Sequence, residues 1–278
     1  MITARGLAAW CGTDRLSAAA PLARRAAEGP LTQASALYAL LVAGRDVPVR
    51  MLPKLDRRLF EVRGDIAHAK VAVLPVGSSL LVCDRLDAPD EPDLVCCPDD
   101  SSYHLARSLP LVSGSWLDLG CGSAFAPLIR RRPAHGCDIN PRALEYAQLG
   151  SELSGVPLVL STDWPSSRWS LISCNAPIPG IAGPVWRATT NDFFDQLYRY
   201  IPAHLEPGGL AVLHATEAAL APLADLPGER VVIGYTPQPG FAVAWWAPDG
   251  ASRYVTSRRL LTAERPHLTF EDRAAALC

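Results

Sequence analysis

The residues best suited to chemistry lie in a stretch where an acidic residue is followed by two glycines. Asp118 belongs to an apolar strand pattern that begins at Trp116, and Gly120 and Gly122 come shortly after it. Glycine at these places lets the backbone turn sharply and approach a ligand with no Cβ in the way. The arrangement is typical of a loop that binds a nucleotide-type cofactor.

Two further residues indicate which cofactor the loop suits. A pyrophosphate-binding loop has a third glycine where this chain has Phe125, whose bulk would crowd a pyrophosphate at the helix N-terminus. The loop therefore points away from NAD. Asp138 follows a second apolar run, twenty positions after Asp118, where a carboxylate can accept both ribose hydroxyls of an adenosine.

Together with two later segments, these residues resemble the ordered motifs of class I S-adenosylmethionine (SAM) methyltransferases. The segments are Asp118–Ala124, Gly136–Leu144, Asp163 and Ser173–Ile178. They are most similar to the branch with an Asn-Pro-Pro-Tyr type tetrapeptide, which includes protein-glutamine, ribosomal-RNA and DNA amino methyltransferases. The resemblance covers residues 95–247 and implies SAM as the cofactor. The expected cofactor-binding residues are Asp118, Gly120, Gly122, Asp138, Ile139, Asp163, Trp164 and Asn175.

In this chain the tetrapeptide reads Asn175-Ala176-Pro177-Ile178. The resemblance implies that the Asn175 side-chain carbonyl and the Ala176 backbone carbonyl accept the N–H groups of the methyl acceptor, so residues 175–177 form the expected catalytic segment. Ile178 replaces the family's aromatic residue and removes base stacking worth roughly 1–3 kcal/mol. Adenine and RNA acceptors are therefore disfavoured. The alternative is that Asn175 only caps a loop.

A short acidic turn precedes the glycine loop and leads into a predicted helix. Asp100 or Ser101 can cap that helix, which is one interpretation of the turn. The other follows from the resemblance, because glutamine methyltransferases place a similar segment beside the methionine tail of SAM. Ser101, Tyr103, His104 and Ile178 are then the expected substrate contacts.

Alternating short apolar strands and helical stretches position these residues. The strand candidates are 116–119, 134–139, 158–161, 170–174, 210–215, 230–235 and 241–246. The alternation predicts the α/β class with a Rossmann-like, doubly wound, mostly parallel sheet. The resemblance implies that the last strand returns antiparallel.

The domain organisation follows from the same pattern. Residues 1–95 suggest short helices and a β-hairpin, which together could form a small, winged-helix-like domain. The resemblance implies that this domain covers the substrate. Residues 96–250 are the expected SAM-binding methyltransferase domain, and residues 251–278 form a C-terminal extension.

Composition limits the partners and the compartment. The 278 residues carry a net charge of −2, and the eight cysteines include no CxxC pair. Salt-dependent binding to nucleic acid is not indicated, and neither a metal site nor a disulfide framework has its usual spacing. We expect a cytoplasmic protein with no membrane span, because no uncharged apolar run reaches about 18 residues.

These observations predict a SAM-dependent enzyme that methylates a nitrogen of a small-molecule amine or amide, such as a specialised metabolite. A protein glutamine amide is the first alternative acceptor, and an amino group of ribosomal RNA is the second. The alternative from another class is a SAM-binding regulatory protein without catalysis, which Ala176 and Ile178 keep open. The oligomeric state is not predicted.

Overall fold

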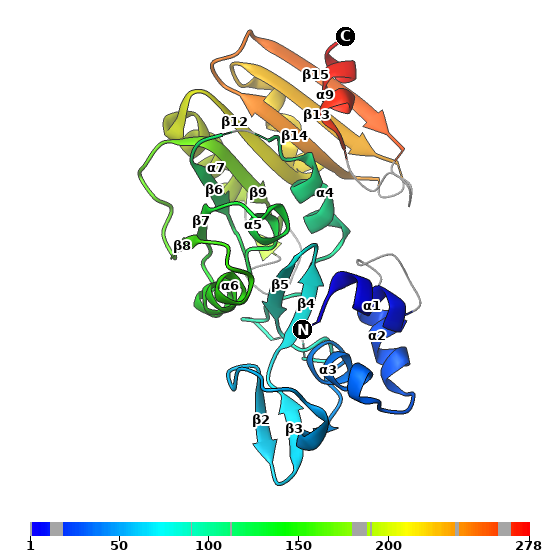
Figure 1. Cartoon of the computed structure of the whole chain (residues 1–278). Coiled ribbons are helices and arrows are strands. Elements are labelled where there is room, and N and C mark those ends of the chain that lie inside the picture. The colour runs from blue at the N-terminus through cyan, green and yellow to red at the C-terminus, as the bar shows by residue number, and fades with distance from the viewer. Residues whose placement is uncertain are drawn as a thin grey trace. The chain divides into compact units, whose positions relative to one another are not determined.

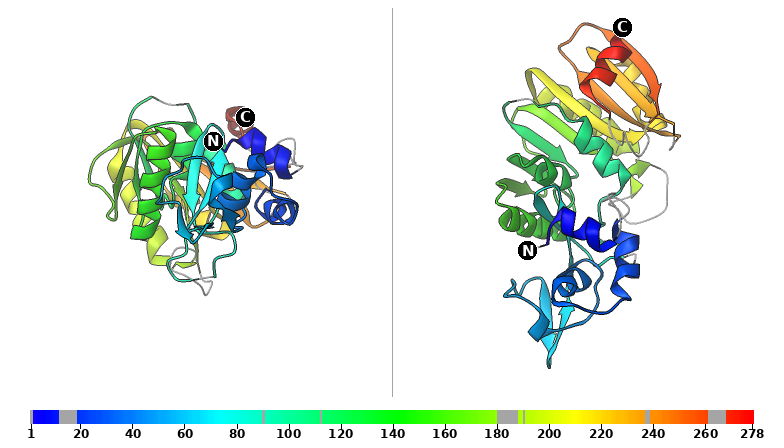
Figure 2. Two further views of the ribbon diagram at one scale, coloured as in Figure 1. Left: turned by 60° about the horizontal axis from the view of Figure 1, so that its bottom comes forward. Right: turned by 45° about the vertical axis from the view of Figure 1, so that its right-hand side comes forward.

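The structure is a computed structural model, and two compact units make up the chain (Figures 1 and 2). It describes residues 2–11, 19–89, 91–111, 113–179, 188–189, 191–236, 239–260 and 268–278. The first unit comprises Met1–Asp99, Gly122–Arg132 and Arg142–Pro157, and the second comprises Asp100–Cys121, Pro133–Pro141 and Leu158–Cys278. The three predicted domains stay predictions, and residues 1, 12–18, 90 and 261–267 of the outer two lie outside the described part.

The first unit contains a group of short helices, a three-stranded antiparallel sheet and a hairpin. Its elements are α1 (Ala4–Cys11), α2 (Ala19–Ala27), α3 (Gln33–Leu41), β1 (Val47–Pro48), η2 (Val49–Met51), β2 (Phe60–Arg63), β3 (Ile66–Ala69), β4 (Ala72–Val76), β5 (Ser79–Cys83), α5 (Phe125–Arg130) and most of α6 (Pro141–Ser154). Helix α3 begins where Thr32 and Ser35 form a reciprocal capping box. Its apolar face, with Leu37 and Leu40, enters the core of this unit.

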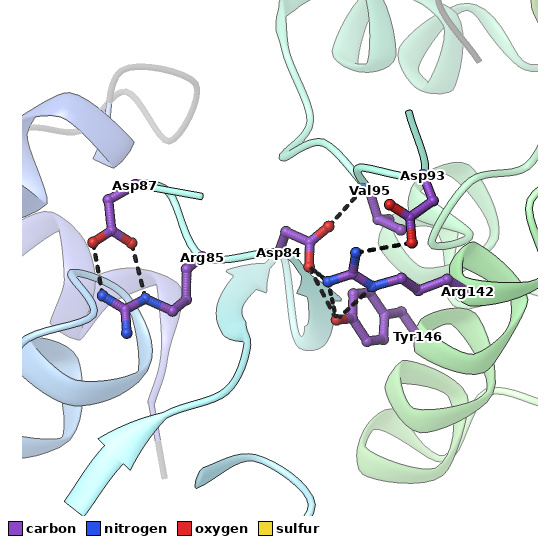
Figure 3. Close-up of polar contacts among 7 residues, drawn as sticks. All are labelled: Asp84, Arg85, Asp87, Asp93, Val95, Arg142 and Tyr146. Carbon is purple, nitrogen blue, oxygen red and sulfur yellow. Dashed lines mark hydrogen bonds and ion pairs between the residues drawn. The ribbon is translucent and has the colours of Figure 1, made fainter. Parts of the chain in front are cut away.

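A buried carboxylate links the segment after β5 to helix α6 in the first unit (Figure 3). Asp84 is 4% exposed and accepts the backbone N–H of Val95 at 2.7 Å and the hydroxyl of Tyr146 at 3.0 Å. The guanidinium of Arg142 pairs with the same carboxylate and also reaches Asp93 at 3.2 Å. A buried charge needs such partners, so this cluster holds Asp84 and the segment 93–95 against α6.

The second unit is built on an eight-stranded sheet in the order β15-β13-β14-β12-β9-β6-β7-β8. The strands are β6 (Trp116–Leu119), β7 (Ala134–Cys137), β8 (Leu158–Ser161), β9 (Trp169–Asn175), β12 (Leu205–Thr216), β13 (Glu229–Tyr235), β14 (Phe241–Ala247) and β15 (Arg253–Arg259). The other elements are α4 (Asp100–Ser108), β10 (Ile178–Pro179), β11 (Ala188–Thr189), α7 (Asn191–His204), α8 (Glu217–Leu220), η3 (Ala221–Asp225) and α9 (Phe270–Leu277).

The sheet is mostly parallel, and the predicted α/β, Rossmann-like class is confirmed. Strand β14 alone runs antiparallel to its neighbours β12 and β13, while β15 pairs in parallel with β13 at the sheet edge. The strand expected to return antiparallel, residues 241–246, is β14 and does so, but it is not the last strand, because β15 follows it in the chain. The residues of β15 are exposed or half-buried, as an edge strand permits, and so they lack the apolar pattern that marks a core strand.

Strand order reverses between β6 and β9. From β6 the chain proceeds outward through β7 and β8, and from β9 it proceeds the other way through β12. In open α/β sheets, ligands bind at the carboxyl ends of the strands beside such a reversal. In the part of the chain that the structure describes, no helix has the length and apolar character to cross a membrane.

Candidate functional site

Three predicted site residues lie at the carboxyl ends of adjacent strands in the second unit. Leu119 of β6 pairs with Cys174 of β9 and with Cys137 of β7. Asn175 and Asp138 each come one residue beyond these partners. The strand register therefore brings both residues, together with Asp118, to the edge where the strand order reverses.

The glycine loop has the backbone conformation that its sequence predicts. Gly120 and Gly122 have φ of 64° and 53°, the left-handed region that favours glycine. A Cβ added at either position would meet nothing within 4 Å, so both backbones have open space beside them. Phe125 is 7% exposed, so its ring packs in the interior. The structure therefore gives no steric reason to exclude a pyrophosphate from the loop, contrary to the expectation from the sequence.

Asp118 ends a buried chain of hydrogen bonds beneath the strand ends. The indole N–H of Trp116 donates to the Ser173 hydroxyl at 2.8 Å, and that hydroxyl donates to the Asp118 carboxylate. Burial raises the pKa of Asp118 to about 7; the bond from Ser173 opposes this rise and the nearby Asp138 adds to it. Ser173 was not predicted, although a serine in an apolar strand is a signal for a buried polar partner.

Asp138 and Ile139 form the turn after β7. The Asn140 N–H donates to the Asp138 carboxylate at 2.9 Å, and the Asp138 N–H donates to the Ser161 carbonyl at 3.2 Å. These bonds hold the turn against the end of β8. Ile139 is 71% exposed, which places a large apolar side chain on the surface directly beside a carboxylate. Such a pair suits a ligand with one apolar face and several hydroxyl groups.

Asp163 and Trp164 follow the end of β8. The backbone carbonyl of Asp163 accepts the Ser161 hydroxyl at 2.8 Å, and its side chain is exposed. Trp164 is half-buried and meets Phe193 and Tyr200 of α7 edge-on, with ring centroids 5.8 and 5.0 Å apart. Helix α7 therefore fixes the Trp164 ring, and its role beside an adenine stays a prediction.

The Asn175 side chain meets a residue from far away in the sequence. Its Nδ2 donates to the Ser101 hydroxyl of α4 at 2.9 Å. The Ala176 N–H donates to the His214 carbonyl of β12 at 2.9 Å, which continues the pairing between β9 and β12 for one more residue. Pro177 and Ile178 are half-buried, and Ile178 pairs with β11.

The other predicted substrate contacts lie on α4. Tyr103 is half-buried, whereas His104 is 8% exposed and its ring lies 4.7 Å from the ring of Tyr235. Tyr235 in turn shares a hydrogen bond with His214 Nε2. No sequence pattern indicated this contact between α4, β12 and β13, and a direct contact of His104 with a substrate stays a prediction.

Metal chemistry has no donor set in the described ranges, where no group of three or more His, Cys, Asp or Glu side chains could hold a metal ion. Burial raises the pKa of the Cys121 and Cys174 thiols well above the ordinary value, with the nearby Asp118 carboxylate adding to the effect. Neither thiol is therefore suited to act as a nucleophile at neutral pH.

Neither a family model nor a curated protein matches the chain. Among solved structures, a methyltransferase from Pyrococcus furiosus is 16% identical, with 54% of this chain and 82% of that chain covered and a TM-score of 0.43. A T. thermophilus 16S rRNA N2 G1207 methyltransferase in complex with AdoMet and guanosine is 18% identical, with 66% and 46% covered and a TM-score of 0.47. A SAM-dependent methyltransferase from Agrobacterium tumefaciens is 17% identical, with 68% and 72% covered and a TM-score of 0.45. At such identities and TM-scores the likeness does not assign an activity or a substrate to this chain.

Proposed function

We propose that the second unit binds SAM and transfers its methyl group to a nitrogen of a small-molecule amine or amide. The observation that carries the proposal is the meeting of Asp118, Asp138 and Asn175 at the carboxyl ends of adjacent strands, beside the reversal of strand order. Each of these residues belongs to a separate sequence motif, and the strand register brings all three to one edge of the sheet.

The residues at this edge fit an adenosine cofactor. The Asp138 carboxylate is proposed to accept the ribose hydroxyls, and the exposed Ile139 side chain to offer an apolar face to the adenine ring. The Asp163 carboxylate is proposed to accept the adenine amino group. Gly120 leaves the room that a methionine tail needs to pass close to the backbone.

SAM supplies an activated methyl group on a sulfonium, so the protein's task is to align the acceptor and to stabilise charge. The Asn175 side-chain carbonyl and the Ala176 backbone carbonyl accept N–H groups and turn the nitrogen lone pair toward the methyl. A neutral amine can attack without a general base and lose its proton afterwards, whereas an amide depends more on these two acceptors.

Two features support a small acceptor over a nucleic acid. The net charge of −2 provides no excess of positive charge for a phosphate backbone. Ile178 stands where stacking on a base would need an aromatic ring. A protein glutamine amide uses the same two carbonyl acceptors, so it is the second candidate acceptor.

The test is to incubate the full chain with methyl-labelled SAM and a panel of acceptors. The panel holds small primary amines, small amides, a glutamine-containing peptide and ribosomal RNA. We expect label in an amine or amide product and an equal amount of S-adenosylhomocysteine, both formed about 30- to 1,000-fold more slowly in Asn175→Ala. Label in the RNA or in the peptide would overturn the small-molecule assignment. Binding of SAM without any S-adenosylhomocysteine would favour the regulatory alternative.

A further inference from the structure

The orientation of the Asn175 amide decides what its site can accept. An asparagine side chain has two ends of nearly equal size: the carbonyl accepts hydrogen bonds and the NH₂ group donates them. The proposed reaction needs the carbonyl toward the acceptor nitrogen, because an NH₂ group there would oppose the substrate N–H. In the structure the NH₂ end is engaged with Ser101, at 2.9 Å.

Helix α4, which carries Ser101, is held on the sheet by contacts further along it. His104 lies three residues after Ser101 and so on the same helix face, and its ring packs 4.7 Å from that of Tyr235. At the far end of the helix, the Trp245 indole N–H donates to the Ser108 carbonyl at 3.1 Å. These two contacts anchor α4 to β13 and β14.

Tyr235 is also connected to Asn175 through the central sheet. Tyr235 shares a hydrogen bond with His214, which pairs with Asn175 in the parallel register of β12 and β9. The His214 carbonyl also accepts the Ala176 N–H. Asn175 is therefore held through its backbone by β12 and through its amide by α4, and both elements meet at Tyr235.

We infer that Ser101 is a positioning residue: it binds the NH₂ end of Asn175 and thereby presents the carbonyl end to the methyl acceptor. The inference rests on the proposed function. It gives Ser101 the role of holding Asn175, in place of the substrate contact expected from the sequence. It also narrows the acceptor to a group that donates a hydrogen bond, since a fixed carbonyl cannot serve a group that only accepts.

The test reads the Asn175 amide directly by NMR. The chain contains three asparagines, at positions 140, 175 and 191, so labelling of asparagine side chains with ¹⁵N gives three pairs of NH₂ signals. They are assigned by replacing each asparagine in turn. In Ser101→Ala, we expect the Asn175 NH₂ signal to shift and its hydrogen exchange with solvent to accelerate about fivefold, the factor for one neutral hydrogen bond. Ser101→Thr keeps the hydroxyl and should restore the parent signal.

Ser102→Ala is the matched control, because Ser102 is the neighbouring serine on α4 and is half-buried like Ser101. An Asn175 signal that is the same in Ser101→Ala and the parent, or that changes equally in Ser102→Ala, would overturn the inference. The signal needs no cofactor or acceptor. Failure of the parent to bind S-adenosylhomocysteine in a parallel titration would therefore contradict the proposed function, whatever the NMR signals show.

Discussion

Replacement of Asp118 by asparagine tests whether the carboxylate beneath the site is destabilised by burial. Asp118 is 4% exposed, and its pKa is raised from 3.8 to about 7, mainly because burial disfavours the charged form. Asparagine has the same shape and keeps an oxygen that accepts the Ser173 hydroxyl, but it carries no charge at any pH. The variant therefore removes the titration and preserves the packing.

The raised pKa sets both the sign and the size of the effect. Between pH 4 and pH 7 the folded chain keeps a proton on Asp118 that the unfolded chain has lost, so the free energy of unfolding falls as the pH rises. Above pH 7 Asp118 is deprotonated in both states, so its contribution to the free energy of unfolding no longer changes with pH. At roughly 1.4 kcal/mol for each tenfold change in proton affinity, a pKa raised from 3.8 to about 7 corresponds to about 4 kcal/mol.

The assay is urea unfolding of the parent and Asp118→Asn, from about pH 4 to about pH 8. The variant should match the parent at the acidic end and exceed its free energy of unfolding by about 4 kcal/mol at the alkaline end. Asp163→Asn, at an exposed position, is the control, since an exposed carboxylate carries little burial cost. A difference between parent and variant that does not change with pH would refute the reasoning.

Three further predictions concern the site and the first unit. Asp138→Ala should weaken S-adenosylhomocysteine binding about ten- to a hundredfold by calorimetry, for a loss of about 1.5–3 kcal/mol; an unchanged dissociation constant would place the ribose elsewhere. Asn175→Ala should keep that dissociation constant and lower the single-turnover rate about 30- to 1,000-fold; an equal rate would remove Asn175 from the mechanism. Asp84→Ala removes the buried carboxylate that pairs with Arg142, and it should lower the free energy of unfolding by about 3 kcal/mol. Asp87→Ala is the control and should lower it by less than about 1 kcal/mol, because the Asp87 carboxylate that pairs with Arg85 is exposed. Equal losses in these two variants would contradict the burial argument.

The elements that position the site could be predicted where the residues of a strand are apolar, whether the strand is buried, as β6 is, or lies at the sheet edge, as β8 does. Residues 116–119 and 158–161 form strands with the predicted bounds, because short apolar runs between turns are a sufficient signal. Residues 253–259 form an edge strand with polar, half-exposed side chains, and no local pattern distinguishes such a strand from a loop.

The partners of the site residues could not be predicted. Ser101 and Asn175 are 74 positions apart, and His214 and Tyr235 meet across an intervening strand. Each pair depends on the register of the sheet and on where α4 packs, which are tertiary properties. A sequence motif thus indicates that Asn175 belongs to the site, but only the fold indicates which group holds its amide.

The most direct test of the central claim is a calorimetric titration of the full chain with S-adenosylhomocysteine and, separately, with NAD. The cofactor proposal predicts saturable binding of one S-adenosylhomocysteine per chain, weakened in Asp138→Ala, and tighter than any binding of NAD. Binding of NAD without binding of S-adenosylhomocysteine would contradict it.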